Sequence, residues 1–366
     1  NYTRVPALGI NEDFIRAMED ASGIDLHQFR RWYTQAGTPV LNISGTYHAD
    51  KNQYSLKIKQ SCPDTPGQNT KLPFYIPFRM GLLDKFGAEL PLKLEGEEGP
   101  ASFDKVLTLS QEVQYFYFLD VPEPPVPSLL RSFSAPVRLN FDYSREDLHF
   151  LMIHDTDGFN RWNASQLLAS DIIDELQKCA VDDLTLALPQ ILIDAYSGVL
   201  NSALESKILD KAMIAQLLTL PAEGLLIDQA EIADIDSIHS VREFTANMLA
   251  NNLEGSFEEV FKANSSNKAF KVDAESIAQR ALKNLALAYL VRTDKDNWIK
   301  DCYRQFEDAT NMTDQLAALR CLVSSGSELG VDIATSALQA FYEKWKHEPL
   351  VVDQWFIVQA SCQRKG

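Results

Sequence analysis

The stretch QFRRWYTQAGTP, residues 28–39, marks the point where a helical pattern ends and a strand pattern begins. Gly37 suits the left-handed residue that closes a helix, and Pro39 cannot continue one. Apolar side chains three and four residues apart precede this stop, as on the buried face of a helix. These side chains are Leu26, Phe29, Trp32 and Tyr33.

A second helical pattern lies upstream, where apolar residues recur at the same spacing until Ser22-Gly23 interrupts them. We therefore expect two short helices over residues 11–36. Two helices of this length are too small to bury a core by themselves, so they must pack against another part of a protein. The upstream apolar residues are Phe14, Ile15, Met18 and Ala21.

From Pro39 to Asp155 the hydrophobic period becomes two. In QYSLKIKQS, residues 53–61, apolar and polar side chains alternate, which is typical of a half-buried strand. Turn residues recur every eight to twelve positions or so, which predicts an antiparallel β-sandwich. The predicted strands cover residues 53–61, 74–84, 105–110, 113–119, 129–134, 137–143 and 148–153.

Three of these strand patterns carry further predictions. Pro77, inside the strand at 74–84, favours an edge position or a bulge because proline lacks an N–H donor. The strands at 105–110 and 113–119 flank Gln111-Glu112, so they are a candidate hairpin.

Residues 156–366 show helical patterns throughout. Thr313 is the predicted N-cap of one helix, and Gly330 and Pro349 are expected to separate helices. Many helices with short joints and no fixed repeat predict an irregular, superhelix-like array of paired helices. The predicted helices cover residues 170–205, 207–219, 236–263, 273–292, 295–309, 313–325, 331–346 and 350–361.

Composition excludes several classes of function. The chain has 366 residues, of which 45% are hydrophobic, and a net charge of -17, so it lacks the cationic surface of a nucleic-acid binder. No uninterrupted apolar run is long enough to span a membrane, and the first residues do not resemble a secretory signal. Five scattered cysteines without a CxxC pair predict reduced thiols in a cytoplasmic protein.

We find no metal site in the sequence pattern. A zinc peptidase helix carries two histidines four apart with a glutamate after the first, and the sequence lacks that motif. His149 and His154 lie five apart at a predicted strand, which puts them on opposite faces. DTDGFN, residues 155–160, lacks the later acidic ligands of a calcium loop, so Gly158 is interpreted as a turn.

Other polar stretches are also interpreted as structural. SSGSE, residues 324–328, is a loop between helices rather than a nucleophile elbow. In DQAEIADIDSIHS, residues 228–240, Ile232, Ile235 and Ile238 recur three apart beneath a solvated acidic face. We therefore predict no catalytic, cofactor-binding or metal-binding residue in this chain.

Several long segments, in order, resemble bacterial aminopeptidase N, a family of zinc aminopeptidases of the gluzincin class. The resemblance runs from about Glu12 to Ala360. The segments are AMEDASGIDLHQFRRWYTQAGTP (17–39), QYSLKIKQSCPDTPGQ (53–68), LLRSFSAPVRL (129–139), FLMIHDTDGFNRW (150–162), NMTDQLAALRCLV (311–323) and EKWKHEPLVVDQWFIVQA (343–360).

The resemblance implies that residues 1–38 are the last helices of a catalytic domain, residues 39–155 a β-sandwich domain, and residues 156–366 an incomplete helical domain. The family's zinc ligands and other catalytic residues precede the matching region, so none is carried over. The chain is expected to be an inactive fragment that binds no zinc, whereas the parent enzyme uses zinc to remove N-terminal residues from peptides.

The resemblance also implies a role for each part. The sandwich would act as a spacer, and the helical domain would close a chamber that admits peptides. The parent is expected to be a bacterial cytoplasmic monomer that binds neither nucleic acid nor membrane. The alternative is a free-standing scaffold that binds other proteins through the concave face of its helical array.

Overall fold

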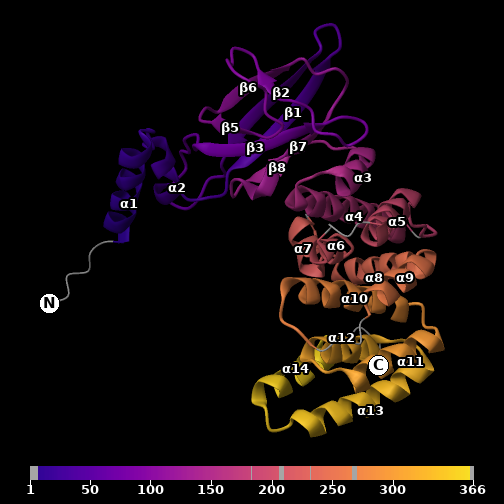
Figure 1. The fold of residues 1–366 in the computed structure, drawn as a ribbon. Helices are drawn as coiled ribbons and strands as arrows, with labels where there is room; N and C mark the ends of the chain where they lie inside the picture. The colour runs from indigo at the N-terminus through magenta and orange to yellow at the C-terminus, as the bar shows by residue number, and fades with distance from the viewer. Residues whose placement is uncertain (1–6, 183, 206–209, 231, 266–269, 363–366) are drawn as a thin grey trace, which may run out of the picture. The chain divides into compact units, whose positions relative to one another are not determined.

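The computed structural model describes residues 7–182, 184–205, 210–230, 232–265 and 270–362. The chain divides into two compact units, residues 1–160 and residues 161–366, and each is described by itself. Figure 1 shows strands in the first unit and helices in the second. The predicted fold class, a β-sandwich followed by a helical array, is confirmed. Within the described residues, no helix combines the length and the hydrophobicity needed to cross a bilayer.

The first unit begins with the two predicted short helices. Helix α1 spans Ala7–Ser22, and a 3-10 turn at Gln28–Arg30 leads directly into α2, Arg31–Thr34. Gly37 has φ +99°, the left-handed conformation that the sequence predicts for a helix stop.

Two sheets follow. One has the strand order β4-β6-β2-β1-β8 and the other β5-β3-β7. Within the described residues, the strands pair antiparallel except β1 with β8, which pair parallel. The strands are β1 Val40–His48, β2 Gln53–Ser61, β3 Ile76–Leu83, β4 Lys93–Leu94, β5 Lys105–Leu109, β6 Val113–Leu119, β7 Val126–Leu129 and β8 Arg138–Asn140.

The alternating side chains of the strands fill one core, as the period of two predicts. Leu56 and Ile58 of β2 and Phe78 of β3 are almost fully buried. Because inward side chains from both sheets interlock, this hydrophobic core holds the sandwich together. Trp32 of α2 packs against the same core.

The hairpin predicted for residues 105–119 is wrong. β5 pairs with β3, and β6 pairs with β2 and β4, so the two strands belong to different sheets. Gln114 accepts hydrogen bonds from the backbone N–H groups of Ser110 and Gln111 and fixes the link that crosses between sheets. A short polar link therefore does not distinguish a hairpin from a crossing between sheets.

Pro77 lies in β3, the central strand of its sheet, not in an edge strand. It is nevertheless at a local edge, because it faces Thr108 of β5 while β7 pairs only with Met80–Leu83. The missing N–H of the proline therefore costs no ladder hydrogen bond on the β7 side.

Two predicted strands are wrong near the end of the first unit. Residues 148–153 belong to helix α3, Arg145–His154, which begins with a capping box between Ser144 and Asp147. Only Leu129 of the strand predicted at 129–134 is extended, because a 3-10 turn at Arg131–Phe133 follows.

The second unit is helical. Buried residues between Leu287 and Val358 form one hydrophobic core, which includes Ile299, Cys302, Leu319 and Phe341. Helix α4 begins at the end of the first unit. The helices are α4 Gly158–Val181, α5 Gln190–Glu205, α6 Lys211–Leu217, α7 Glu223–Gln229, α8 Ile235–Asn252, α9 Glu254–Asn264, α10 Ala274–Val291, α11 Asp296–Asp308, α12 Met312–Ser324, α13 Glu328–Trp345 and α14 Pro349–Ala360.

Several helix limits differ from the prediction. The patterns at 170–205 and 236–263 each contain two helices, and α7 was not predicted. Asn311, not Thr313, caps α12 by accepting a hydrogen bond from the N–H of Asp314. Gly330 lies in the first turn of α13 rather than between helices, because Ser327 caps that helix.

The stripe predicted beneath residues 228–240 is also wrong. Ile232 and Ile235 are 90% and 62% exposed, and only Ile238 is buried. Helix α8 begins at Ile235, so the three isoleucines do not share one helical face.

Candidate functional site

The histidines are not arranged as a metal centre. His149 and His154 lie on α3, not on a strand, and five residues on a helix turn by about 500°, so the two rings point in different directions. The ring of His154 lies beside that of Phe150, with centroids 4.8 Å apart and the two planes tilted by 39°. Among the residues that the structure describes, no group of three or more His, Cys, Asp or Glu side chains could hold a metal ion.

The DTDGFN motif stabilises the junction between α3 and α4. Asp157 accepts hydrogen bonds from the N–H of Asn160 and from the hydroxyl of Ser132. The side chain of Asp155 is fully buried and forms an ion pair with Arg131 at 3.4 Å. Burial raises the pKa of Asp155 above its ordinary value. Gly158 is the first residue of α4 rather than a turn at the edge of a sheet.

The N-terminal helices have one face attached to the sandwich. The indole N–H of Trp32 donates to the carbonyl of Tyr75 at 2.8 Å, and its ring lies 4.6 Å from that of Phe74. The Gln28 amide donates to the carbonyls of Pro73 and Ser110 at 2.9 and 2.7 Å. Trp32 therefore already has a partner within the chain.

Ion pairs hold α1 against the segment that follows it. The guanidinium of Arg30 contacts Glu12 at 2.9 Å and Glu19 at 2.8 Å. The hydrogen bonds that Arg30 donates lower the pKa of Glu19 to about 2. This clamp fixes which side of α1 points away from the sandwich.

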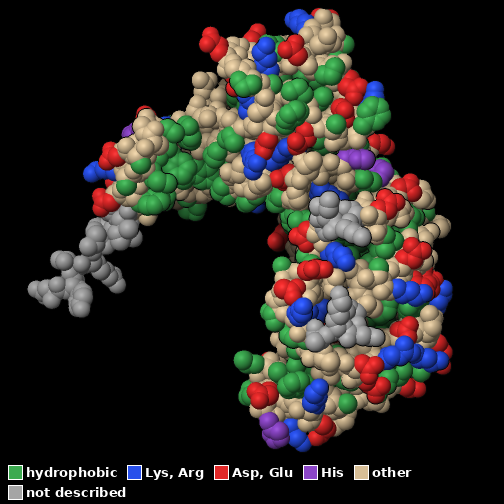
Figure 2. All heavy atoms as spheres, in the orientation of Figure 1, with side chains coloured by type: hydrophobic (Ala, Val, Ile, Leu, Met, Phe, Trp, Pro, Cys, Tyr) green, Lys and Arg blue, Asp and Glu red, His purple; other side chains and the backbone are tan. Residues whose placement is uncertain are grey.

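The opposite side of these helices is an exposed hydrophobic surface, which we call the N-terminal apolar face. Phe14, Met18, Ile24 and Tyr33 are 59%, 50%, 52% and 45% exposed. Figure 2 shows hydrophobic side chains gathered over α1 and α2. Because an isolated soluble domain rarely exposes several large apolar residues together, this face is a candidate interface.

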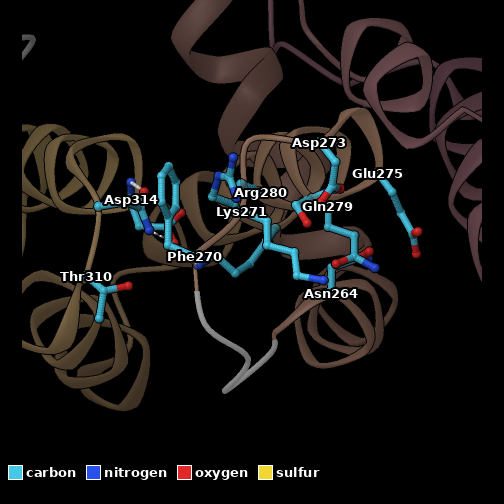
Figure 3. Close-up of a pocket in the computed structure, with 12 residues that line it drawn as sticks. Asn264, Phe270, Lys271, Asp273, Glu275, Gln279, Arg280, Thr310 and Asp314 are labelled. Carbon is cyan, nitrogen blue, oxygen red and sulfur yellow. Dashed lines mark hydrogen bonds and ion pairs between the residues drawn. The ribbon is translucent and has the colours of Figure 1, made fainter.

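A polar pocket of about 210 Å³ lies in the helical unit, where the end of α9 and the starts of α10 and α12 meet. Figure 3 shows its side chains arranged around one hollow. Lys283 pairs with Asp314 at 2.7 Å, and Arg280 lies 4.7 Å from the ring of Phe270. Since these cations already have partners, we assign no ligand to the pocket.

A second hollow, of about 530 Å³, is lined by residues of α8, α10 and α12 together with the loops that follow α10 and α12. Arg292 crosses it to pair with Glu243 at 2.6 Å. Cys321 of α12 also lines it. Sequence patterns did not indicate either hollow, because each is formed by helices that are far apart in the chain.

Comparison with known proteins places this architecture in a family. A family model described as "Domain of unknown function (DUF3458_C) ARM repeats" matches residues 145–366, more than half of the chain. The chain belongs to the DUF3458_C family. Residues 37–142 of this DUF3458_C protein match a second model, described as a domain of unknown function (DUF3458) with an Ig-like fold.

The DUF3458_C protein is similar to bacterial aminopeptidase N. It is 37% identical to "Aminopeptidase N" of Escherichia coli over 96% of this chain and 39% of the relative. It is 35% identical to the protein of the same name in Haemophilus influenzae, again over 96% and 39%. The chain therefore spans about two fifths of the length of these relatives.

A solved structure shares the fold. The crystal structure of Legionella pneumophila aminopeptidase A in complex with aspartic acid superposes with a TM-score of 0.79 at 32% identity, over 96% of this chain and 39% of that one. The resemblance to bacterial aminopeptidase N in the sequence is thereby confirmed.

Proposed function

We propose that this chain is the non-catalytic part of a zinc-dependent aminopeptidase that removes N-terminal residues from peptides. The observation that carries the proposal is the continuous similarity to aminopeptidase N over 96% of the chain. The chain spans only 39% of that relative. In the proposal, the catalytic machinery belongs to the portion that the match does not cover.

The zinc site lies outside this chain in the proposal. The described residues do not fit a zinc centre, since three or four clustered His, Cys or carboxylate ligands are needed and no such cluster is found among them. No catalytic step is therefore derived from these residues, and the chain alone is expected to be inactive.

The N-terminal apolar face supports a contact with a catalytic domain. Residues 1–38 belong to that domain in the proposal, and Phe14 and Met18 would be buried against it. The Arg30 clamp presents these side chains in a fixed orientation, which lowers the entropic cost of docking. Ile24 and Tyr33 of the same N-terminal segment are also exposed.

The other two domains have supporting roles in the proposal. The Ig-like sandwich, residues 39–155, would be a rigid spacer, and the array of ARM repeats, residues 156–366, would close a chamber around peptide substrates. Helical repeats of this kind form concave surfaces suited to such a role. The parent would be a cytoplasmic monomer without nucleic-acid or membrane partners.

The reading frame upstream of the codon for Asn1 tests the proposal. We expect a continuous upstream frame that encodes an HExxH motif followed by a further glutamate ligand. A start codon directly before Asn1, with no such motif, would favour a free-standing scaffold. The chain alone, with added zinc, should not hydrolyse an alanine chromogenic substrate. Hydrolysis well above that of a metal-free control would also overturn the proposal.

The docking role has a separate test in the full-length parent. Phe14→Ser with Met18→Ser should lower its thermal stability and loosen the catalytic domain, because two apolar contacts are lost. Ile232→Ser is the matched control, since that side chain is 90% exposed and lies in the other unit. Equal effects of both changes would contradict the contact.

A further inference from the structure

Two cysteines face each other across neighbouring helices of the second unit. Cys302 of α11 is fully buried, and its sulfur lies 3.4 Å from the carbonyl oxygen of Ala318 in α12. Cys321 is three residues after Ala318, and helical side chains lean back over the preceding turn. Both sulfurs therefore lie near the same turn of α12, close enough for each thiol to influence the pKa of the other.

Small solutes can approach only one of the pair through the 530 Å³ hollow. Cys321 is partly exposed and lines that hollow, whereas Cys302 is not among the lining residues. Arg292 and Arg320 line the same hollow, together with Glu243 and Asp294. Glu243 pairs with Arg292 at 2.6 Å, and Asp294 accepts a hydrogen bond from Ser325.

The electrostatic surroundings make the two thiols unequal. The neighbouring Cys302 thiol lowers the pKa of Cys321, and the charges of Arg292 and Arg320 act in the same direction against the effect of burial. The neighbouring Cys321 thiol and burial raise the pKa of Cys302. One sulfur is thus favoured as a thiolate nucleophile and the other stays a protonated neighbour.

We propose that Cys321 is an oxidation site for small peroxides and that Cys302 resolves the oxidised sulfur as an intramolecular disulfide. The Cys321 thiolate attacks one peroxide oxygen, the O–O bond breaks, and hydroxide leaves, so that sulfur loses two electrons and becomes a sulfenic acid. The Cys302 sulfur then attacks the sulfenic sulfur, an S–S bond replaces the S–O bond, and the hydroxide leaves with the Cys302 proton as water.

The remaining cysteines provide internal controls. Burial raises the pKa of Cys62, which lies in the first unit. The Cys362 thiol donates to the carbonyl of Val323 at 3.2 Å. Val323 is two residues after Cys321 and therefore points to a different side of α12, so Cys362 is not placed to resolve Cys321.

Peptide mapping of the peroxide-treated protein tests the proposal. The purified protein is exposed to hydrogen peroxide, unreacted thiols are alkylated, and the digest is examined by mass spectrometry without reduction. We expect one linked peptide pair that joins Cys302 to Cys321 and separates again on dithiol treatment. We expect Cys321 to react at least about tenfold faster than Cys62, because thiolate fraction sets the rate.

Substitutions identify the role of each sulfur. Cys302→Ala should leave a Cys321 sulfenic acid that a dimedone-type probe traps, and Cys321→Ala should abolish the linked pair. Cys179→Ala is the matched control and should leave the pair unchanged. These outcomes use no peptidase assay, so they are independent of the proposed function.

Three results would overturn the inference. One is a Cys321 that remains a free thiol under conditions that oxidise Cys62. Another is a linkage of Cys321 to Cys362 in place of Cys302. The third is loss of the linked pair in the Cys179→Ala variant. The mapping of the unsubstituted protein stands even if Cys302→Ala fails to fold.

Discussion

Replacing Arg131 by methionine should destabilise the sandwich strongly. Arg131 is 3% exposed and lies between Glu89 at 2.7 Å, Asp155 at 3.4 Å and the hydroxyl of Ser128 at 2.8 Å. Methionine keeps most of the apolar volume but removes the charge and the donors. Glu89 is 28% exposed at its side chain and can turn to water, whereas Asp155 is 0% exposed and cannot.

The size of the destabilisation follows from the Asp155 carboxylate, which stays buried after Arg131 is replaced. Breaking a buried ion pair by removing one partner costs about 3–5 kcal/mol. Asp155 retains a hydrogen bond from the N–H of Asp157 at 2.9 Å, so the lower end of that range applies. A loss of about 3 kcal/mol in the free energy of unfolding corresponds to a roughly 150-fold change in the equilibrium between the folded state and the open state from which amides exchange.

Hydrogen exchange of the amides in β3 and β7 measures this change for the first unit alone. Arg131→Met should speed the slowest of these amides by roughly 150-fold. Arg79→Met is the matched control in β3, since the Arg79–Asp104 pair is partly exposed and its loss should change exchange by less than about tenfold. Similar exchange in the two variants would refute the argument.

The loss of stability caused by Arg131→Met should depend on pH. Burial gives Asp155 a raised pKa in the folded state, so the folded state holds its proton more tightly than the unfolded state. The stability contributed by this group therefore falls as pH rises from the ordinary aspartate pKa through the raised folded value. Without Arg131 this pKa rises further, so the penalty of Arg131→Met should be largest at neutral pH and shrink in acid. A penalty that does not change with pH would contradict this assignment.

Three further predictions concern single positions. Gly81→Ala should cost roughly 3 kcal/mol in urea unfolding, because the new Cβ would lie 2.3 Å from the guanidinium carbon of Arg131, and Arg131→Met should relieve the cost. Asn311→Ala should cost about 1 kcal/mol by thermal unfolding, because it removes the cap of α12. Burial alone would raise the pKa of Asp314, but hydrogen bonds from Lys283, Asn311 and Asn284 outweigh it and lower that pKa. Asp314→Asn should therefore destabilise the helical unit at neutral pH and lose its effect as acid protonates the carboxyl, a trend that unfolding curves across pH would check.

Local patterns predicted the parts of the fold that depend on neighbours in the sequence. The alternation in residues 53–61 predicted β2, and Gly37 predicted the end of the N-terminal helices. The helical pattern at 295–309 predicted α11, which spans Asp296–Asp308. These predictions succeed because one strand face or one helix face must be apolar to reach any core.

Tertiary structure decided what the patterns left open. Residues 148–153 are apolar enough for a strand, but the Ser144–Asp147 capping box begins a helix there. The strands at 105–109 and 113–119 separate into two sheets because each finds its partner elsewhere in the sequence.

The sequence by itself determined the order of domains and the family, because both follow from similarity over long runs of residues. It predicted that the N-terminal helices need a further packing partner, but not which of their apolar side chains stay exposed. It did not reveal the buried Arg131–Asp155 pair or the Cys302–Cys321 pair. Each of these depends on distances between segments that are apart in the chain. Such distances are set by how helices and sheets pack against one another, and no local pattern encodes them.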